Sequence, residues 1–159
     1  MEGIKKLNQV HKILDFHVKN NPDNVSVSVD RVSYTNSDIF SKVLSLVGLL
    51  KENKVTSGDR IAYLAKNSSE FIELMYASSI LGLVMVPINF RLAYEEVKFI
   101  IQDSGSKIII FGEEFKELVE KVNFDKTDLQ LSLGISELRK LLKTASPVAF
   151  DVLSSTNKA

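Results

Sequence analysis

Short apolar segments alternate with amphipathic segments in the middle of the chain, and this alternation limits the fold more than any other feature. The apolar segments are RIAYLA (60–65), LVMV (83–86) and KIIIF (107–111). Between them, 69–81 and 94–103 repeat apolar residues at the spacing of one helix face. Continuously apolar short strands between helices are typical of a parallel sheet covered on both faces. We therefore predict an α/β fold in which 83–86 is a buried central strand.

The chain before this alternation is expected to add a helix and a hairpin. Residues 4–19 carry apolar side chains at helical spacing. Residues 25–30 alternate apolar and polar side chains, which predicts a half-exposed strand that pairs with the residues after a turn at Asp30-Arg31. Thr35, with Asp38 three residues later, matches the capping box that begins a helix.

The remaining elements are predicted from periodicity and from capping positions. After Gly112 the pattern indicates helices over 113–122 and 136–143, with a strand near 129–133. Asn67 and Ser68 precede the helix over 69–81 and are interpreted as its caps. The apolar side chains that this helix is expected to bury are Phe71, Leu74, Met75 and Ile80.

Composition and charge exclude several classes of function. The 159 residues contain 20 basic and 20 acidic side chains and no cysteine. Without net charge, no global field attracts nucleic acid or an anionic membrane. Disulfide and thiol chemistry are excluded, which suits a cytoplasmic protein. The longest apolar run, 80–88, is too short for a transmembrane segment.

The sequence lacks the familiar catalytic devices. It has neither a G-x-S-x-G elbow nor a glycine-rich phosphate loop. His11 and His17 lie six residues apart, so they face different sides of one helix. Without cysteine or an acidic cluster at ligand spacing, a metal site is not predicted. Glu95-Glu96 and Glu113-Glu114 are expected in first helical turns, where they complement the helix dipole. We therefore predict no catalytic residue and no metal ligand.

A candidate binding edge follows from the predicted sheet. Loops that leave the carboxyl ends of parallel strands gather on one edge, where ligands of open α/β sheets bind. Here they are 66–68, 87–92 and 112–113. Arg91 lies just before a predicted helix start, where unpaired N–H groups favour an anion, so a phosphate is chemically reasonable there.

A second interpretation of Arg91 needs no ligand. Arg91 could instead form an ordinary surface ion pair with Glu95 or Glu96, as isolated arginines commonly do. The residues of the loop alone favour this simpler interpretation.

Four motifs in order resemble the N-terminal region of the adenylate-forming superfamily, the AMP-binding enzymes. They are SYTNSDI, SGDRIAYLAKNSSEF, ILGLVMVPINFRL and EEVKFIIQDSGSKIII. The resemblance is strongest over 32–111 and looser beyond Gly112. It implies that 1–159 is a single unit, the N-terminal portion of the large domain of an acyl-CoA synthetase, with a partial parallel sheet, helices on both faces, an N-terminal helix and a β-hairpin.

The wording of one loop narrows the resemblance to a branch. Peptide-synthetase adenylation domains usually have Asp-Pro after the proline of the third motif, whereas this chain has Asn89-Phe90-Arg91, which is similar to acyl- and aryl-CoA ligases. The resemblance implies that Arg91, with Phe90 and Asn89, lies beside the nucleotide part of coenzyme A. Many relatives have threonine where this chain has Ala93, which removes a helix cap.

The family activity implied is the ATP-dependent joining of a carboxylate, such as a fatty acid, to CoA. A carboxylate attacks the α-phosphate of ATP-Mg²⁺ to give an acyl-adenylate and pyrophosphate, and the CoA thiol then displaces AMP. The family's phosphate-binding loop and its lid are not in this sequence. The chain by itself is therefore expected to be an inactive N-terminal fragment that binds no cofactor tightly.

Two other interpretations remain open. The chain could be a stand-alone binding or regulatory domain that kept the sheet and lost the chemistry, with CoA or a protein as its ligand. An unrelated flavodoxin-like domain is disfavoured, because no phosphate or flavin loop follows the first parallel strand. A partial sheet is also expected to expose apolar surface and to favour a homodimer.

Overall fold

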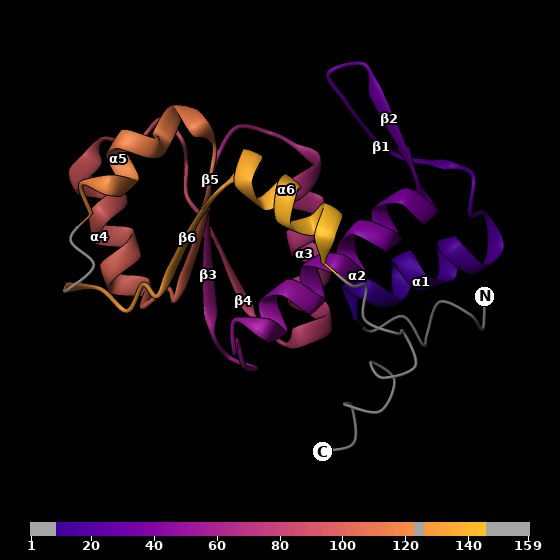
Figure 1. The fold of residues 1–159 in the computed structure, drawn as a ribbon, viewed down its shortest axis with the longest axis horizontal. Helices are drawn as coiled ribbons and strands as arrows, with labels where there is room; N and C mark the ends of the chain where they lie inside the picture. The colour runs from indigo at the N-terminus through magenta and orange to yellow at the C-terminus, as the bar shows by residue number, and fades with distance from the viewer. Residues whose placement is uncertain (1–8, 123–125, 146–159) are drawn as a thin grey trace.

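A computed structural model describes residues 9–122 and 126–145 (Figure 1). Helices, strands and one 3₁₀ turn alternate along most of it. In chain order these are α1 (Val10–Asn20), β1 (Val25–Val29), β2 (Val32–Thr35), α2 (Asn36–Glu52), β3 (Arg60–Leu64), α3 (Ser69–Leu81), β4 (Val84–Pro87), α4 (Tyr94–Ser104), β5 (Ile108–Phe111), η2 (Glu113–Phe115), α5 (Lys116–Glu120), β6 (Leu131–Gly134) and α6 (Ile135–Thr144).

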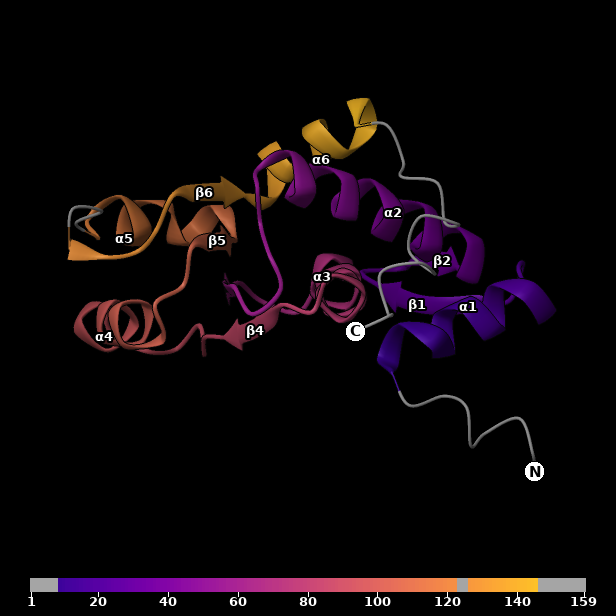
Figure 2. The ribbon, with the colours of Figure 1, turned by 90° about the horizontal axis from the view of Figure 1, so that it is seen from below.

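The main sheet has four parallel strands in the order β4-β3-β5-β6. Helices α2, α3 and α6 lie on one face, and α4 and α5 lie on the other (Figures 1 and 2). Strand β5 shows why its sequence is continuously apolar. Ile108 and Ile110 pack into the first core, which lies between the sheet and helices α2, α3 and α6. Ile109 and Phe111 pack into the second core, which lies between the sheet and helices α4 and α5. The predicted α/β class with both faces covered is confirmed.

Strand β4 is an edge strand, so the prediction that it is central and buried is wrong. Val84 is 49% exposed, and within residues 9–122 and 126–145 only β3 pairs with β4. The Val84 and Ile88 N–H groups donate to the carbonyls of Asp59, just before β3, and Tyr63, within it. The nitrogen of Pro87 therefore lies on the open side of β4. A proline is tolerated there because no neighbouring strand needs its missing N–H. An apolar segment predicts that both faces of the strand are covered by other elements. It does not predict whether the strand has one neighbouring strand or two.

The N-terminal part forms a separate layer beyond α2 and α3. Strands β1 and β2 form the predicted antiparallel hairpin, with Asp30 and Arg31 at positive φ in its turn. Helix α1 packs against α2 and α3 on the side away from the sheet. Residues 4–8 of the predicted first helix lie outside the described residues, and Gln9 is the N-cap of α1.

The C-terminal part follows the prediction with one change of helix type. The expected helix over 113–122 is a 3₁₀ turn, η2, followed by the five-residue α5. The strand predicted near 129–133 is β6, and the helix predicted over 136–143 is α6.

Helix α2 begins with the predicted capping box. The Asp38 N–H donates to the Thr35 hydroxyl at 3.1 Å, and the Thr35 N–H donates to the Asp38 carboxylate at 2.8 Å. Hydrogen bonds from the Thr35 backbone and hydroxyl lower the pKa of Asp38. Helix α4 keeps only half of this arrangement. The Ala93 N–H donates to Glu96 at 2.9 Å, but Ala93 has no oxygen to accept in return.

Ala93→Thr is expected to raise the free energy of unfolding by about 1 kcal/mol. Ala93 has φ −74° and ψ 162°, close to the −74° and 169° of Thr35, so a threonine there is already in the capping conformation. Urea unfolding of both proteins measures the difference. Ala93→Val is the matched control, because it adds the same shape without a hydroxyl. An equal gain with valine would show that capping is not the cause.

Candidate functional site

The loops after β3, β4 and β5 come together at the carboxyl edge of the sheet, as predicted. Phe90, after β4, contacts Phe115, after β5, with ring centroids 6.5 Å apart. Lys66 Nζ, after β3, lies 3.5 Å from Glu114, also after β5. A hollow of about 330 Å³ opens between the first two loops. It is lined by Tyr63, Ala65, Lys66, Asn67, Phe71, Pro87, Ile88, Asn89 and Phe90.

The loop after β4, 88–92, has a defined backbone conformation. Ile88 is buried, and its N–H donates to the Tyr63 carbonyl at 2.8 Å. The Asn89 side-chain oxygen accepts from the Arg91 N–H at 3.0 Å, and the Asn89 carbonyl accepts from the Leu92 N–H at 3.2 Å. An asparagine that bonds the backbone two residues later forms an Asx turn. Hydrogen bonds within the loop and to β3 therefore hold its backbone in one conformation.

Phe90 is half-buried, so the expectation that Asn89, Phe90 and Arg91 are exposed together holds only for Asn89 and Arg91. Phe90 packs against the second core beside Phe115. The Arg91 guanidinium carbon lies 5.3 Å from the Phe90 ring centroid, within cation–π range. The Phe90 ring thus lies between the second core and the Arg91 guanidinium, which is the charged group of the loop.

Arg91 does not form the surface ion pair of the simpler interpretation. Glu95 Oε2 lies 3.7 Å from Lys98 Nζ, and Glu96 accepts from the Ala93 N–H. Within residues 9–122 and 126–145, no carboxylate lies within 4.0 Å of the Arg91 guanidinium. An exposed cation that has no carboxylate partner in the described part of the chain can bind an anion from solution.

The helix ends at this edge contribute less to anion binding than the sequence suggested. Glu96 already accepts the Ala93 N–H at the start of α4, and Glu95 adds a second negative charge. At the start of α6, the Ser136 N–H donates to Glu113 at 2.9 Å, and this bond lowers the pKa of Glu113. Glu113 therefore caps a later helix, which the dipole argument did not anticipate. Arg91 is the only basic side chain of the loop 88–92.

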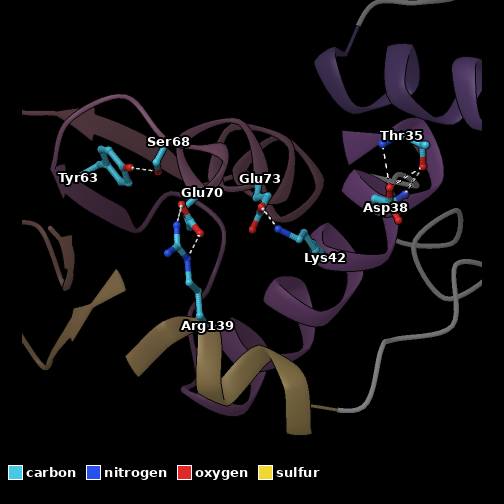
Figure 3. Close-up of polar contacts among 8 residues, drawn as sticks. All are labelled: Thr35, Asp38, Lys42, Tyr63, Ser68, Glu70, Glu73 and Arg139. Atoms are coloured by element: carbon cyan, nitrogen blue, oxygen red, sulfur yellow. Dashed lines mark hydrogen bonds and ion pairs between the residues drawn. The ribbon is translucent and has the colours of Figure 1, made fainter. Parts of the chain in front are cut away.

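Ser68, one of the two predicted caps of α3, lies at the N-cap position, but its side chain has a different partner. Its hydroxyl lies 2.8 Å from the Tyr63 hydroxyl and makes no cap hydrogen bond (Figure 3). Burial raises the pKa of Tyr63. The Tyr63 ring packs edge-on against Phe71, so the wall of the hollow is fixed by aromatic contacts from β3 and α3.

Two buried carboxylates on α3 were missed by the sequence analysis. Glu70 and Glu73 are 2% and 1% exposed. Arg139 on α6 holds Glu70 with bonds of 2.6 and 3.2 Å, and Lys42 on α2 holds Glu73 at 3.1 Å (Figure 3). They lie beside a second hollow of about 460 Å³. Because each carboxylate already has a cation, this cluster ties α2, α3 and α6 together.

The two glutamates differ in their pKa. Burial raises the pKa of Glu70, but hydrogen bonds from Arg139 and Ser68 outweigh it, and the pKa is lower than usual. Burial raises the pKa of Glu73, and the single Lys42 contact does not reverse this. Three or more His, Cys, Asp or Glu side chains arranged to hold a metal ion do not occur in the described part of the chain. None of its helices is long and apolar enough to span a bilayer.

The chain therefore folds as a parallel α/β sheet with strand-end loops gathered at its carboxyl edge, which is the edge where ligands of open α/β sheets bind. The family comparison makes this specific. The family model "AMP-binding enzyme" matches residues 14–156. The chain belongs to the AMP-binding enzyme family.

The curated relatives are ligases. The chain is 45% identical over 80 residues to long-chain-fatty-acid–CoA ligase FadD13 of Mycobacterium tuberculosis, covering 50% of this chain and 15% of that protein. It is 31% identical over 121 residues to fatty acid–[acyl-carrier-protein] ligase ScoC of Streptomyces coeruleorubidus, covering 76% and 23%. The chain thus spans less than a quarter of the length of either relative.

Solved structures place the fold in the same family. The N-terminal domain of FACL13 from Mycobacterium tuberculosis matches with a TM-score of 0.82 and 29% identity, over 89% of this chain and 38% of that one. The anthranilate CoA ligase AuaEII matches with a TM-score of 0.83 at 18% identity, over 89% and 28%, which supports the fold alone. The predicted N-terminal subdomain of an adenylate-forming enzyme is confirmed.

Proposed function

We propose that this chain is the N-terminal portion of the large domain of an AMP-forming acyl-CoA ligase, and that Arg91 contacts a phosphate of CoA. The observation that carries the second part is the exposed Arg91 guanidinium, which lies against the Phe90 ring and has no carboxylate partner among the described residues. A guanidinium suits phosphate because its planar donors match the phosphate oxygens. The relative named long-chain-fatty-acid–CoA ligase supports a fatty-acid substrate for the longer protein. The absence of cysteine supports a cytoplasmic location.

The reaction of the longer protein would proceed in two steps. A carboxylate displaces pyrophosphate from ATP and forms an acyl-adenylate, and the CoA thiol then displaces AMP. We assign ATP, Mg²⁺ and the acyl pocket to the longer protein, because this chain spans only 15–23% of the curated relatives above. The residues here would hold the CoA nucleotide, so this chain alone should not adenylate a carboxylate.

Titration of the ¹⁵N-labelled chain with CoA tests the assignment. We expect amide signals of residues 88–92 to shift, and dephospho-CoA, which lacks the 3′-phosphate, to shift them less if Arg91 meets that phosphate. Arg91→Ala should reduce the response to CoA by about tenfold, the loss expected for one charge-assisted contact. Arg31→Ala is the matched control, because it removes the same charge at the hairpin turn, away from the loop.

The outcomes separate the proposed contact from its alternatives. If CoA moves no signal in this loop, the CoA contact at Arg91 is wrong. If CoA binds and the coding sequence that specifies this chain is a complete gene without a partner gene, the stand-alone binding domain is the better interpretation. Equal responses of Arg31→Ala and Arg91→Ala would reduce the effect to net charge.

We also propose that exposed apolar side chains allow this chain to form homodimers. Phe99 on α4 is 63% exposed, and Leu92 and Ile100 lie beside it in a shallow hollow. Sedimentation equilibrium at increasing concentration should show a mass above that of the monomer, and Phe99→Ser should shift the protein toward monomer. A constant monomer mass at high concentration would rule out this association.

A further inference from the structure

We propose that Asn89 is a positioning residue that acts on CoA only through Arg91, which deepens and rests on the proposed function of this loop. The family resemblance implies that Asn89 lies beside the nucleotide part of CoA, where it would be a direct contact. The structure assigns its side-chain oxygen to the Arg91 N–H at 3.0 Å. An oxygen that accepts this bond fixes the backbone from which the Arg91 side chain leaves.

The loop is fixed on both sides of this bond. Before it, the Ile88 N–H is bound to the Tyr63 carbonyl, and Ile88 is 5% exposed. After it, the Leu92 N–H donates to the Asn89 carbonyl, and the Ala93 N–H donates to Glu96. Between these anchors, the Arg91 N–H donates to the Asn89 side chain. Loss of this bond would free the backbone at Arg91 without loosening the strand.

The second support for Arg91 is aromatic. Phe115 packs against Phe90, and the Arg91 guanidinium lies over Phe90. The Asx turn fixes the backbone position of Arg91. The Phe90 ring fixes the position of the Arg91 guanidinium. A charged group held in its binding conformation loses less conformational entropy when a ligand arrives. Asn89 therefore contributes to CoA affinity by preorganising Arg91.

The orientation of the Asn89 amide is consistent with this role. The amide carries one acceptor oxygen and a donor nitrogen, and the oxygen is the atom turned back to the chain. A direct phosphate contact would use the nitrogen, and such a contact would not depend on Arg91. This difference makes the two roles experimentally separable.

The test is a double-mutant cycle in which isothermal titration calorimetry measures the affinity of this chain for CoA. Asn89→Ala should weaken CoA about three- to tenfold, the effect of one modest hydrogen bond. In an Arg91→Ala background the same change should have almost no effect, because the group that Asn89 positions is gone. Asn89→Ser should recover most of the affinity, since a serine hydroxyl can form the equivalent turn.

Asn20→Ala is the matched control. Asn20 is also exposed, and its amide nitrogen donates to the Phe16 carbonyl at 2.7 Å, on α1 away from the loop. It should leave CoA binding unchanged. A full, additive loss from Asn89→Ala in the Arg91→Ala background would overturn the positioning role and indicate a direct contact.

A separate measurement distinguishes failure of this inference from failure of the CoA proposal. Hydrogen exchange of the Arg91 amide, without ligand, should become faster in Asn89→Ala and return toward the original rate in Asn89→Ser. If CoA does not bind but exchange changes as expected, the turn is real and the CoA contact is wrong. If CoA binds and exchange at Arg91 is unchanged, the CoA contact stands and the positioning role is wrong.

Discussion

Replacing Ile110 with alanine is expected to lower the free energy of unfolding by about 2–5 kcal/mol. Ile110 lies in β5, which has a strand neighbour on each side, and its side chain is 0% exposed in the first core. Removing its methyl and methylene groups leaves a cavity among side chains from α2, α3 and α6 that cannot collapse freely. Urea unfolding followed by circular dichroism measures the loss.

The contrasting variant is Val84→Ala in β4. Val84 is 49% exposed on the edge strand, so the expected loss is about 0.5–1 kcal/mol. Isoleucine has one more carbon than valine, which accounts for about 1 kcal/mol of the difference. A loss at Val84 as large as that at Ile110 would mean that β4 is covered, as the sequence analysis first predicted.

This contrast shows what an apolar run can and cannot predict. The segments 83–86 and 107–111 are similarly apolar, and both were correctly predicted as strands. The pairing order distinguishes them, because β5 lies between β3 and β6, whereas β4 pairs with β3 alone among the strands that the structure describes. Strand order depends on which face each connecting helix covers, and a single segment's composition carries no such information. Pro87 at the end of β4 was the local sign of an edge, since proline avoids central positions.

The capping box at Thr35 and the Asp30-Arg31 turn were predictable because they are local. Their partners lie within three residues, so the sequence contains the whole arrangement. The strand-end loops were also placed correctly, because parallel topology brings the carboxyl ends to one edge. The half-burial of Phe90 was not predictable. Its partner, Phe115, is 25 residues away in a segment whose helix type was itself uncertain.

The buried carboxylates on α3 were missed for the same reason. The helical spacing predicts that Phe71, Leu74, Met75 and Ile80 face the core, but of these only Leu74 is fully buried. Glu70 and Glu73 take the adjacent inward positions because Arg139 and Lys42 neutralise them, from 69 and 31 residues away. The sequence feature that could have indicated these buried carboxylates is the presence of two glutamates, three residues apart, on a mostly apolar helix.

Arg139→Ala is expected to lower the free energy of unfolding by about 2–3 kcal/mol, because it leaves the buried Glu70 carboxylate without its cation. The upper part of the range for buried pairs does not apply, since the Arg139 side chain is 56% exposed and screened by water. Lys140→Ala, the next residue on α6 and an exposed one, should cost less than about 0.5 kcal/mol. Equal losses would show that helix propensity or charge is responsible, and not the ion pair.

The pH dependence should separate Glu70 from Glu73, because their pKa values move in opposite directions in the folded protein. A lowered pKa at Glu70 means that its contribution is present at neutral pH and is lost as the pH falls through the folded pKa. A raised pKa at Glu73 means that its contribution is present below the unfolded pKa and is lost as the pH rises through the folded pKa.

Glutamine variants of the two residues are expected to change the free energy of unfolding in opposite directions. At pH 7, Glu70→Gln should destabilise the protein, because Arg139 then loses its charged partner. Glu73→Gln should stabilise it or leave it unchanged, because glutamine avoids the cost of a buried charge and its oxygen can still accept from Lys42. Urea unfolding between pH 4 and pH 8 measures both, and the benefit of Glu73→Gln should shrink as the pH falls. Destabilisation by Glu73→Gln at pH 7 equal to that by Glu70→Gln would show that both carboxylates are stabilised as anions, and that Lys42 is as strong a partner as Arg139.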